Sequence, residues 1–120
     1  MRTLIVDDEP DMRFLMRATL WLDDGTHEMD EASNGEDALA AWRVSKPDLV
    51  VLDMRMPGIS GLEVAREMLA QDPDQCVVMC SAYMEQHEVD EATRIGVAAC
   101  VDKYQITTLP QVIDGVLRLL

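Results

Sequence analysis

Charged residues stand directly after short apolar segments of this chain, and their types could support chemistry on phosphate or on a metal ion. Asp7 and Asp8 follow the first segment, and Asp53 follows another in the middle of the chain. Lys103 comes after the last such segment. If these segments are neighbouring parallel strands, their carboxyl ends lie at one edge of a sheet, where open α/β sheets bind ligands. The sequence therefore predicts a crevice with three carboxylates and one ammonium group.

Carboxylates that gather in one place need a compensating positive charge. Two of them about 4 Å apart repel by roughly 4 kcal/mol in a surface-like dielectric. A hard divalent cation bound by the carboxylate oxygens, together with Lys103, would supply that compensation. We therefore expect a metal-assisted site that can accept a phosphoryl group.

The composition is typical of a small folded domain. The chain has 120 residues, enough to bury one hydrophobic core, and 48% of them are apolar. No apolar run approaches the roughly 20 residues that a membrane span needs, and no signal-peptide pattern precedes the first segment. Cys76, Cys80 and Cys100 lack CxxC spacing, which favours reduced thiols over a disulfide framework or a zinc site. We expect a cytoplasmic protein that does not contact the membrane.

The formal net charge of the chain is −13. This charge argues against direct nucleic-acid binding by the domain, because contacts to phosphate need Lys and Arg. It would suit a basic protein partner, although solvated helix surfaces account for most of such charge.

Strand-like and helix-like segments alternate along the whole chain. Residues 4–6, 49–52 and 77–79 are almost continuously apolar, as in parallel strands covered on both faces. The polar segment 27–32 suits one edge of the sheet, and the short segment 98–101 suits the other. We expect strands near residues 2–7, 27–32, 48–53, 76–81 and 98–102, and helices near residues 10–22, 34–45, 61–71, 86–95 and 109–120. Right-handed crossovers then give an α/β fold with a doubly wound, five-stranded parallel sheet.

Several helix starts and ends have recognisable capping signals. A Ser or Thr three residues before an acid or amide predicts a capping box. The pairs with this spacing are Ser33 with Glu36, Ser60 with Glu63, and Thr108 with Gln111. Pro10 suits a first helical turn, and Gly96 suits a helix end.

Over its whole length the chain resembles the receiver domain of the two-component response-regulator family. The matching motifs are Leu4–Pro10 (LIVDDEP), Asp53–Gly58 (DMRMPG) with Gly61, Ser81–Ala82, and Lys103. One such motif would be weak support, but all of them in order, each at the end of a predicted strand, are specific. The resemblance implies a flavodoxin-like (βα)5 fold with strand order 2-1-3-4-5. It also implies a phosphorylation-controlled signalling switch, in which Asp53 accepts a phosphoryl group from a kinase phosphohistidine.

The resemblance further implies a Mg²⁺ cofactor and its ligands. Asp8 and Asp53 would bind the ion directly, together with the backbone carbonyl of Arg55. Asp7 would act largely through water.

Other residues would contact the phosphoryl group itself. Lys103 would be a mobile positive charge beside its oxygens. Ser81, a common alternative to the family's Thr, would donate a hydroxyl hydrogen bond beside the backbone amides of residues 54 and 82. Self-phosphorylation from a phosphodonor and autodephosphorylation are the only reactions this implies, so we do not expect a conventional enzyme.

Besides Ser81, two further positions depart from the family pattern. Cys100 stands where the family usually has Tyr or Phe, and Tyr104 replaces the Pro that usually follows the lysine. We expect a trans peptide bond between Lys103 and Tyr104, because a cis bond without proline costs about 2.5–4 kcal/mol. We also expect the signal to leave through the 81–88 loop and the fourth helix, with Tyr83 or Tyr104 substituting for the missing ring.

The resemblance implies two kinds of partner. A sensor histidine kinase or phosphotransfer protein would supply the phosphoryl group. An output domain or effector protein would bind the face formed by the fourth helix, fifth strand and fifth helix. A phosphorylation-dependent dimer also fits the family pattern. We expect residues 1–120 to be a single receiver domain without an output domain, and the sequence leaves open whether it stands alone or belongs to a longer regulator.

Two alternative functions stay open on the sequence. One is a pseudo-receiver that recognises a partner protein without phosphorylation. The other is a phosphatase that forms an aspartyl-phosphate intermediate. Such phosphatases usually need a second acid two residues after the nucleophile, where this chain has Arg55.

Overall fold

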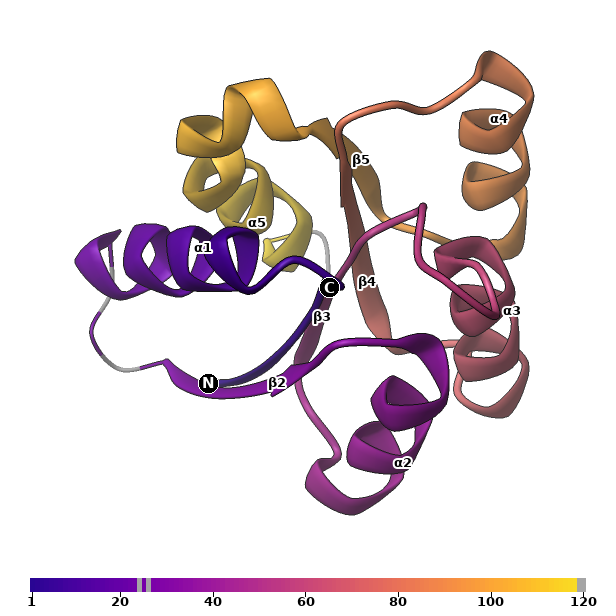
Figure 1. Ribbon diagram of the computed structural model, residues 1–120, viewed down its shortest axis with the longest axis horizontal. Helices are drawn as coiled ribbons and strands as arrows, with labels where there is room; N and C mark the ends of the chain where they lie inside the picture. Colours follow the sequence, from indigo (N-terminus) through magenta and orange to yellow (C-terminus); the bar gives the residue numbers. More distant parts are fainter. Residues whose placement is uncertain (24, 26, 119–120) are drawn as a thin grey trace.

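The computed structural model describes residues 1–23, 25 and 27–118, and within them five strands form one parallel sheet. Helices cover both faces of the sheet, and the strand order is β2-β1-β3-β4-β5 (Figure 1). The strands are β1 (Arg2–Val6), β2 (Glu28–Ala32), β3 (Leu49–Leu52), β4 (Cys76–Ser81) and β5 (Ala99–Asp102). The helices are α1 (Pro10–Asp23), α2 (Gly35–Ser45), α3 (Gly61–Gln71), α4 (Gln86–Ile95), the 3₁₀ helix η1 (Lys103–Thr108) and α5 (Leu109–Leu117). The predicted flavodoxin-like fold and strand order are confirmed.

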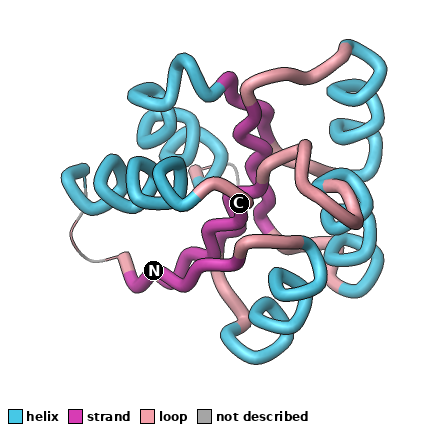
Figure 2. Tube along the Cα trace, viewed as in Figure 1, coloured by secondary structure: helices cyan, strands magenta, loops and turns pink. Residues whose placement is uncertain are grey.

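The central strands separate two hydrophobic cores. Along β3, Val50 and Leu52 belong to one core, whereas Leu49 and Val51 belong to the other. Successive side chains of a strand point to opposite faces, so a strand between two cores must be apolar at every position. Helices α2, α3 and α4 cover the first core, and α1 and α5 cover the second (Figure 1 and Figure 2).

The predicted strands match the observed ones to within a residue at each end. The polar strand β2 and the short strand β5 are the two edges, as expected. The predictions did not include η1, which begins where the side chain of Asp102 accepts a hydrogen bond from the Tyr104 amide at 2.8 Å. Helix α5 ends at Leu117, and residues 119–120 of the predicted helix lie outside the described part of the chain.

The capping predictions were right for one helix and wrong for two. Ser60 caps α3 by accepting from the Glu63 amide at 3.2 Å. Helix α2 is capped by Asn34, not Ser33, because the Asn34 side chain accepts from the Asp37 amide. Thr108 makes no side-chain cap, since η1 runs directly into α5 and leaves no free helix start there.

Helix α4 has a capping box that was not predicted. The Glu85 side chain accepts from the amide of Glu88, and the Glu88 side chain accepts in return from the amide of Glu85. The sequence signal was overlooked because Glu is an unusual residue at the N-cap. At the other end of α4, Gly96 has a φ of 106° and ends the helix as predicted.

Within the described residues, no helix is both long enough and apolar enough to cross a membrane.

Candidate functional site

The register of the sheet brings the ends of its central strands level with one another. Val6 of β1 pairs with Leu52 of β3, so the residues that follow them leave the sheet at the same edge. The amide of Asp53 continues the ladder by donating to the Val6 carbonyl at 3.0 Å. Ser81, the last residue of β4, pairs with Asp102 of β5 and thereby brings Lys103 to the same edge. The fold thus gathers the predicted site residues without any long loop.

Asp53 is buried at this edge, and both of its carboxylate oxygens accept hydrogen bonds. Lys103 Nζ donates to Oδ2 at 3.1 Å, and Ser81 Oγ donates to Oδ1 at 3.0 Å. The backbone amide of Arg55 lies 3.3 Å from Oδ1. Charge-assisted hydrogen bonds of this kind fix the orientation of a carboxylate. The same donors are suited to anionic oxygens that would be attached to Asp53.

Lys103 links Asp53 to a second buried carboxylate. Its Nζ lies 2.7 Å from Oδ2 of Asp7, which is fully buried, and the lysine side chain itself is only 9% exposed. Oδ1 of Asp7 accepts from the amide of Glu9 at 2.9 Å. The guanidinium of Arg13 donates to the backbone carbonyl of Asp7 at 2.8 Å, which ties α1 to the end of β1. One ammonium group therefore bridges two carboxylates.

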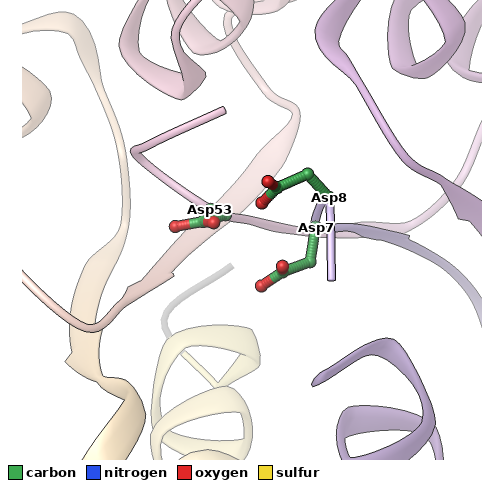
Figure 3. A group of neighbouring side chains, drawn as sticks. All are labelled: Asp7, Asp8 and Asp53. Carbon is green, nitrogen blue, oxygen red and sulfur yellow. The ribbon is translucent and has the colours of Figure 1, made fainter. Parts of the chain in front are cut away.

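The third acid of the cluster, Asp8, is exposed. One carboxylate oxygen from each of Asp7, Asp8 and Asp53 lies within 4.8 Å of the others, and the three side chains come from the ends of β1 and β3 (Figure 3). Within the described residues, the buried Oδ2 of Asp7 has no well-directed hydrogen bond, despite its short ion-pair distance to Lys103. A buried oxygen that accepts no hydrogen bond destabilises the folded state. Grouped carboxylate oxygens are the usual ligands of Mg²⁺ and Ca²⁺. The residues present therefore fit a hard divalent cation.

The site contains more negative than positive charge. Burial raises the pKa of Asp53 above its ordinary value, the nearby Asp7 raises it further, and Lys103 offsets only part of the rise. Burial would lower the pKa of Lys103, but its contacts with Asp7 and Asp53 outweigh burial, and the pKa of the lysine is raised. Lys103 is therefore held as an ammonium ion beside two carboxylates, and an added cation would relieve the remaining repulsion.

The loop after Asp53 is held close to helix α3. The amide of Gly61 donates to the Met54 carbonyl at 2.9 Å. A Cβ atom at position 61 would lie 1.9 Å from the backbone carbonyl oxygen of Asp53, far inside contact distance. Only glycine allows this approach of the helix to the loop. Gly61 thus positions the backbone of Asp53.

The side chain of Arg55 connects this loop to the start of α4. Its guanidinium forms an ion pair with Glu88 at 2.5 Å and lies over the ring of Tyr83, 5.5 Å from the ring centre. The same Glu88 oxygen accepts from the Glu85 amide in the capping box of α4. The loop that follows Asp53 is therefore in direct contact with the cap of α4.

Cys100 and Tyr104, which depart from the family pattern, and the nearby Tyr83 make no unusual contacts with other described residues. Cys100 is half-buried on β5 and packs against the core beneath α3 and α4, where burial raises its pKa. Tyr83 and Tyr104 are both exposed, so neither ring fills a buried position in this conformation. The described residues contain no cis peptide bond, so the predicted trans bond between Lys103 and Tyr104 is confirmed.

Most of the predicted site residues are brought together at one edge of the sheet. These residues are Asp7, Asp8, Asp53, Ser81 and Lys103. Arg55 contributes a backbone amide to Asp53. Two residues that support the site were not predicted. Arg13 has a spacing from Asp7 that fits no motif, whereas the spacing of Glu88 from Glu85 does fit a capping box.

Comparisons with known proteins agree with this arrangement. A family model described as the response regulator receiver domain matches residues 3–114. The chemotaxis protein CheY of Thermotoga maritima is 35% identical over 95 residues, which cover 79% of this chain and 78% of that protein. The positive alginate biosynthesis regulatory protein of Pseudomonas aeruginosa is 42% identical over 86 residues, which cover 71% of this chain and 35% of that protein.

Solved structures show the same fold. The response regulator TrrA of Thermotoga maritima, in complex with Mg(2+)-BeF, has a TM-score of 0.82 and 35% identity, covering 96% of this chain and 97% of that chain. A two-component response regulator of the LuxR family from Aurantimonas sp. SI85-9A1 has a TM-score of 0.90 and 26% identity, covering 98% of this chain and 84% of that chain. Together with the family model, these relatives show that the chain belongs to the receiver-domain family of two-component response regulators.

Proposed function

We propose that this chain is a phosphorylation-controlled signalling switch, in which Asp53 accepts a phosphoryl group from the phosphohistidine of a sensor kinase or phosphotransfer protein. The observation that carries this proposal is the position of Asp53 between Lys103 Nζ at 3.1 Å and Ser81 Oγ at 3.0 Å, beside the Asp7-Asp8 pair. Phosphoryl transfer depends mostly on positioning and on charge stabilisation, and these groups supply both.

In the proposed reaction a carboxylate oxygen of Asp53 attacks phosphorus on the side opposite the imidazole nitrogen. The O–P bond forms as the P–N bond breaks, and the imidazole leaves with the electron pair of that bond. Lys103 and the hydroxyl of Ser81 would donate to the oxygens of the transferred group, which they can reach because both already contact Asp53. The product is an aspartyl phosphate, and its hydrolysis returns the site to its starting state.

Mg²⁺ is the cation that we propose for the acid cluster. Asp8 and Asp53 would hold it directly with the backbone carbonyl of Arg55, and Asp7 would act largely through water. When bound, the ion neutralises negative charge on the phosphoryl and carboxylate oxygens. The TrrA structure, described as a complex with Mg(2+)-BeF, supports this choice because TrrA is 35% identical to this chain.

The output of the switch would pass through α4. The hydroxyl of Ser81 also lies 3.3 Å from the Tyr83 carbonyl, so a phosphoryl group on Asp53 would compete for that donor. Any such competition shifts a conformational equilibrium only if the two conformations contact the group differently. We propose that the 81–88 loop and α4 adopt different positions in the two conformations. Residues 1–120 would form a single receiver domain, and an output domain or effector protein would bind its α4-β5-α5 face.

Incubation with acetyl phosphate and MgCl₂, followed by intact-mass measurement, tests the proposal. Wild type should gain the mass of one phosphoryl group, and Asp53→Asn or added chelator should abolish the gain. Equal gain in Asp53→Asn would contradict the assignment of Asp53. No gain in wild type with either acetyl phosphate or phosphoramidate would favour a pseudo-receiver that acts without phosphorylation.

A further inference from the structure

A cavity opens at the edge of the sheet that lies opposite the acid cluster. It is bounded by the last turn of α2, the last turn of α3 and the loops that lead from these helices into β3 and β4, and we call it the α2–α3 pocket. Helices α2 and α3 pack on the same face of the sheet (Figure 1). The volume of the pocket is about 370 Å³, within the range of about 300–1,000 Å³ typical of small-molecule sites. The residues that line it include Trp42, Arg43, Lys46, Pro47, Asp72 and Gln75.

One wall of the pocket is held in place by hydrogen bonds. Trp42 and Gln75 are each 8% exposed, and the indole N–H of Trp42 donates to Oε1 of Gln75 at 2.8 Å. Nε2 of Gln75 donates to the Cys76 carbonyl at 3.2 Å. A glutamine amide has two N–H donors, and in the described part of the chain only this one has an acceptor. Pro47, which is also buried, adds a second apolar surface. The pocket therefore offers a pre-formed apolar wall and one unused donor.

The rim of the pocket carries two opposite charges that do not pair with each other. Lys46 and Asp72 are exposed, and among the described residues neither lies within 4.0 Å of an oppositely charged group. Arg43, by contrast, is already paired with Glu67 at 2.9 Å. A ligand in the pocket would therefore meet one available ammonium group and one available carboxylate.

The backbone at these two charged residues is fixed by the ends of the helices. Lys46 ends α2, where its amide donates to the Trp42 carbonyl at 3.0 Å. Its φ of 48° lies in the left-handed region, since the right-handed helical region is disfavoured for the residue before Pro47. Asp72 ends α3, and its Oδ1 accepts from the amide of Asp74 at 3.0 Å. Within the described residues, Oδ2 of Asp72 accepts no hydrogen bond and stays available.

We propose that the α2–α3 pocket binds a small zwitterion of the amino-acid class with an apolar side chain. Its carboxylate would accept from Lys46 and from the unused N–H of Gln75, and its ammonium group would donate to Oδ2 of Asp72. Its side chain would pack on Trp42 and Pro47. A simple anion would leave Asp72 unpaired and a simple cation would leave Lys46 unpaired, whereas a zwitterion complements both charges.

The α2–α3 pocket is separate from the phosphoacceptor. Strand β3 begins shortly after Pro47 and ends directly before Asp53, so about 20 Å of extended chain lies between these two residues. Binding in the pocket therefore requires neither a phosphoryl group nor a metal ion. Its failure would leave the proposed phosphorylation of Asp53 untouched.

Titration of isotope-labelled protein with L-leucine, followed by NMR, tests the pocket. The chain has two tryptophans, so its spectrum contains two indole N–H signals, and Trp21→Phe assigns them. Leucine should shift the signal of Trp42, which lines the pocket, and leave the signal of Trp21, which lies on α1, in place.

Two matched compounds test the need for both charges. Isocaproate is leucine without its ammonium group, and isopentylamine is leucine without its carboxylate. Both should bind about tenfold more weakly than leucine, or weaker still, because each leaves one charge on the rim unpaired.

Substitutions that remove single charges locate the binding. Lys46→Gln and Asp72→Asn should each weaken leucine binding about tenfold or more, and Asp72→Asn should also abolish the preference for leucine over isocaproate. Arg118→Gln and Asp114→Asn make the same charge changes at exposed positions near the end of α5 and should leave binding unchanged. All four side chains are exposed, so the variants should stay folded, and thermal melts check this.

Several results would overturn the proposal. One is no shift of the Trp42 signal with either L-leucine or L-phenylalanine up to their solubility limits. Another is equal affinity for leucine and isocaproate, which would show that the pocket does not select a zwitterion. Leucine binding that survives both Lys46→Gln and Asp72→Asn would place the ligand elsewhere.

Discussion

Lys103 is the residue on which the charge balance of the acid cluster depends. It contacts Asp7 at 2.7 Å and Asp53 at 3.1 Å, and it is the only ammonium or guanidinium group within 4.0 Å of either carboxylate in the described residues. Two buried carboxylates therefore share one positive charge.

Replacing the carboxylate of Asp53 should stabilise the metal-free domain. Burial raises the pKa of Asp53, and the negative charge of Asp7 raises it further. The folded chain therefore binds the Asp53 proton more tightly than the unfolded chain does. The stability that this proton gives is complete below the ordinary carboxyl pKa of 3.8 and is lost as pH rises through the raised value. At neutral pH the ionised Asp53 thus destabilises the fold, and Asp53→Asn should raise the free energy of unfolding by about 1 kcal/mol.

Thermal melts in chelator across a pH series measure this effect. The gain should shrink as pH falls toward 3.8, because both proteins are then neutral at position 53. Asp114→Asn, at an exposed position on α5, is the matched control and should change little. A loss of stability in Asp53→Asn at neutral pH would show that the hydrogen bond to Lys103 outweighs the repulsion.

The two neighbouring acids should contribute unequally to the affinity for Mg²⁺. Asp8→Ala removes a proposed direct ligand and should weaken Mg²⁺ binding by about tenfold or more, equivalent to about 1.4 kcal/mol. Asp7→Ala should have a smaller effect, because Asp7 already contacts Lys103 and would act through water. Calorimetric titration with MgCl₂ compares them, with Glu9→Ala as an exposed acidic control. Equal affinities in all the proteins would contradict the proposed ligand set.

A methyl group at position 61 should damage both stability and the site. The Cβ atom of Gly61→Ala would lie 1.9 Å from the Asp53 carbonyl oxygen, so the backbone must move, at a cost of about 3 kcal/mol. Gly115→Ala is the control, because a Cβ atom there meets nothing within 4 Å and alanine favours the interior of α5 by about 1 kcal/mol. Urea unfolding should therefore give changes of opposite sign, and a neutral Gly61→Ala would mean that the loop accommodates the methyl group.

At the scale of elements, the strands could be predicted because their burial is visible in the sequence. A strand between two cores needs an unbroken apolar run, and β3 and β4 have one. Helix caps were predicted less well, because the residue that caps a helix depends on where the preceding loop turns. Asn34 rather than Ser33 caps α2 for this reason. The helix η1 could not be predicted, since it depends on the side chain of Asp102 at the end of β5.

Helix α4 is the element most directly connected to the phosphoacceptor loop. The ion pair of Arg55 with Glu88 joins the residues after Asp53 to the helix cap. Cys100 packs beneath α3 and α4 but exposes or buries only one sulfur atom, whereas an aromatic ring can bury about 150–250 Å². The contact through Glu88 is therefore the better candidate for passing on the signal.

NMR shift changes in α4 on addition of Mg²⁺ and beryllofluoride distinguish these two routes. Cys100→Ala should keep the changes in α4, whereas Glu88→Ala should reduce them, because it removes both the ion pair and half of the capping box. Glu91→Ala, which breaks the neighbouring ion pair with Arg66, is the control and should retain the changes. Normal binding of the mimic with loss of the response in Cys100→Ala would instead identify Cys100 as the relay.

At the scale of the whole molecule, the site could be predicted because the fold and the motifs lead to the same place. Parallel strands in the order 2-1-3-4-5 must bring the ends of β1 and β3 side by side, so acids after both strands must meet. Arg13 could not be predicted, because its spacing from Asp7 fits no motif. The spacing of Glu85 and Glu88 predicts a capping box, but it does not show the ion pair of Glu88 with Arg55, which is 33 residues away in the chain.

The central claim is that Asp53 alone carries the phosphoryl group. Borohydride reduces an aspartyl phosphate to homoserine with loss of phosphate, so the modified position can be read by peptide mass spectrometry after treatment with acetyl phosphate and MgCl₂. We expect homoserine at position 53 and unmodified aspartate at positions 7 and 8. Homoserine at position 7 or 8, or at no position despite a mass gain in the intact protein, would contradict this claim.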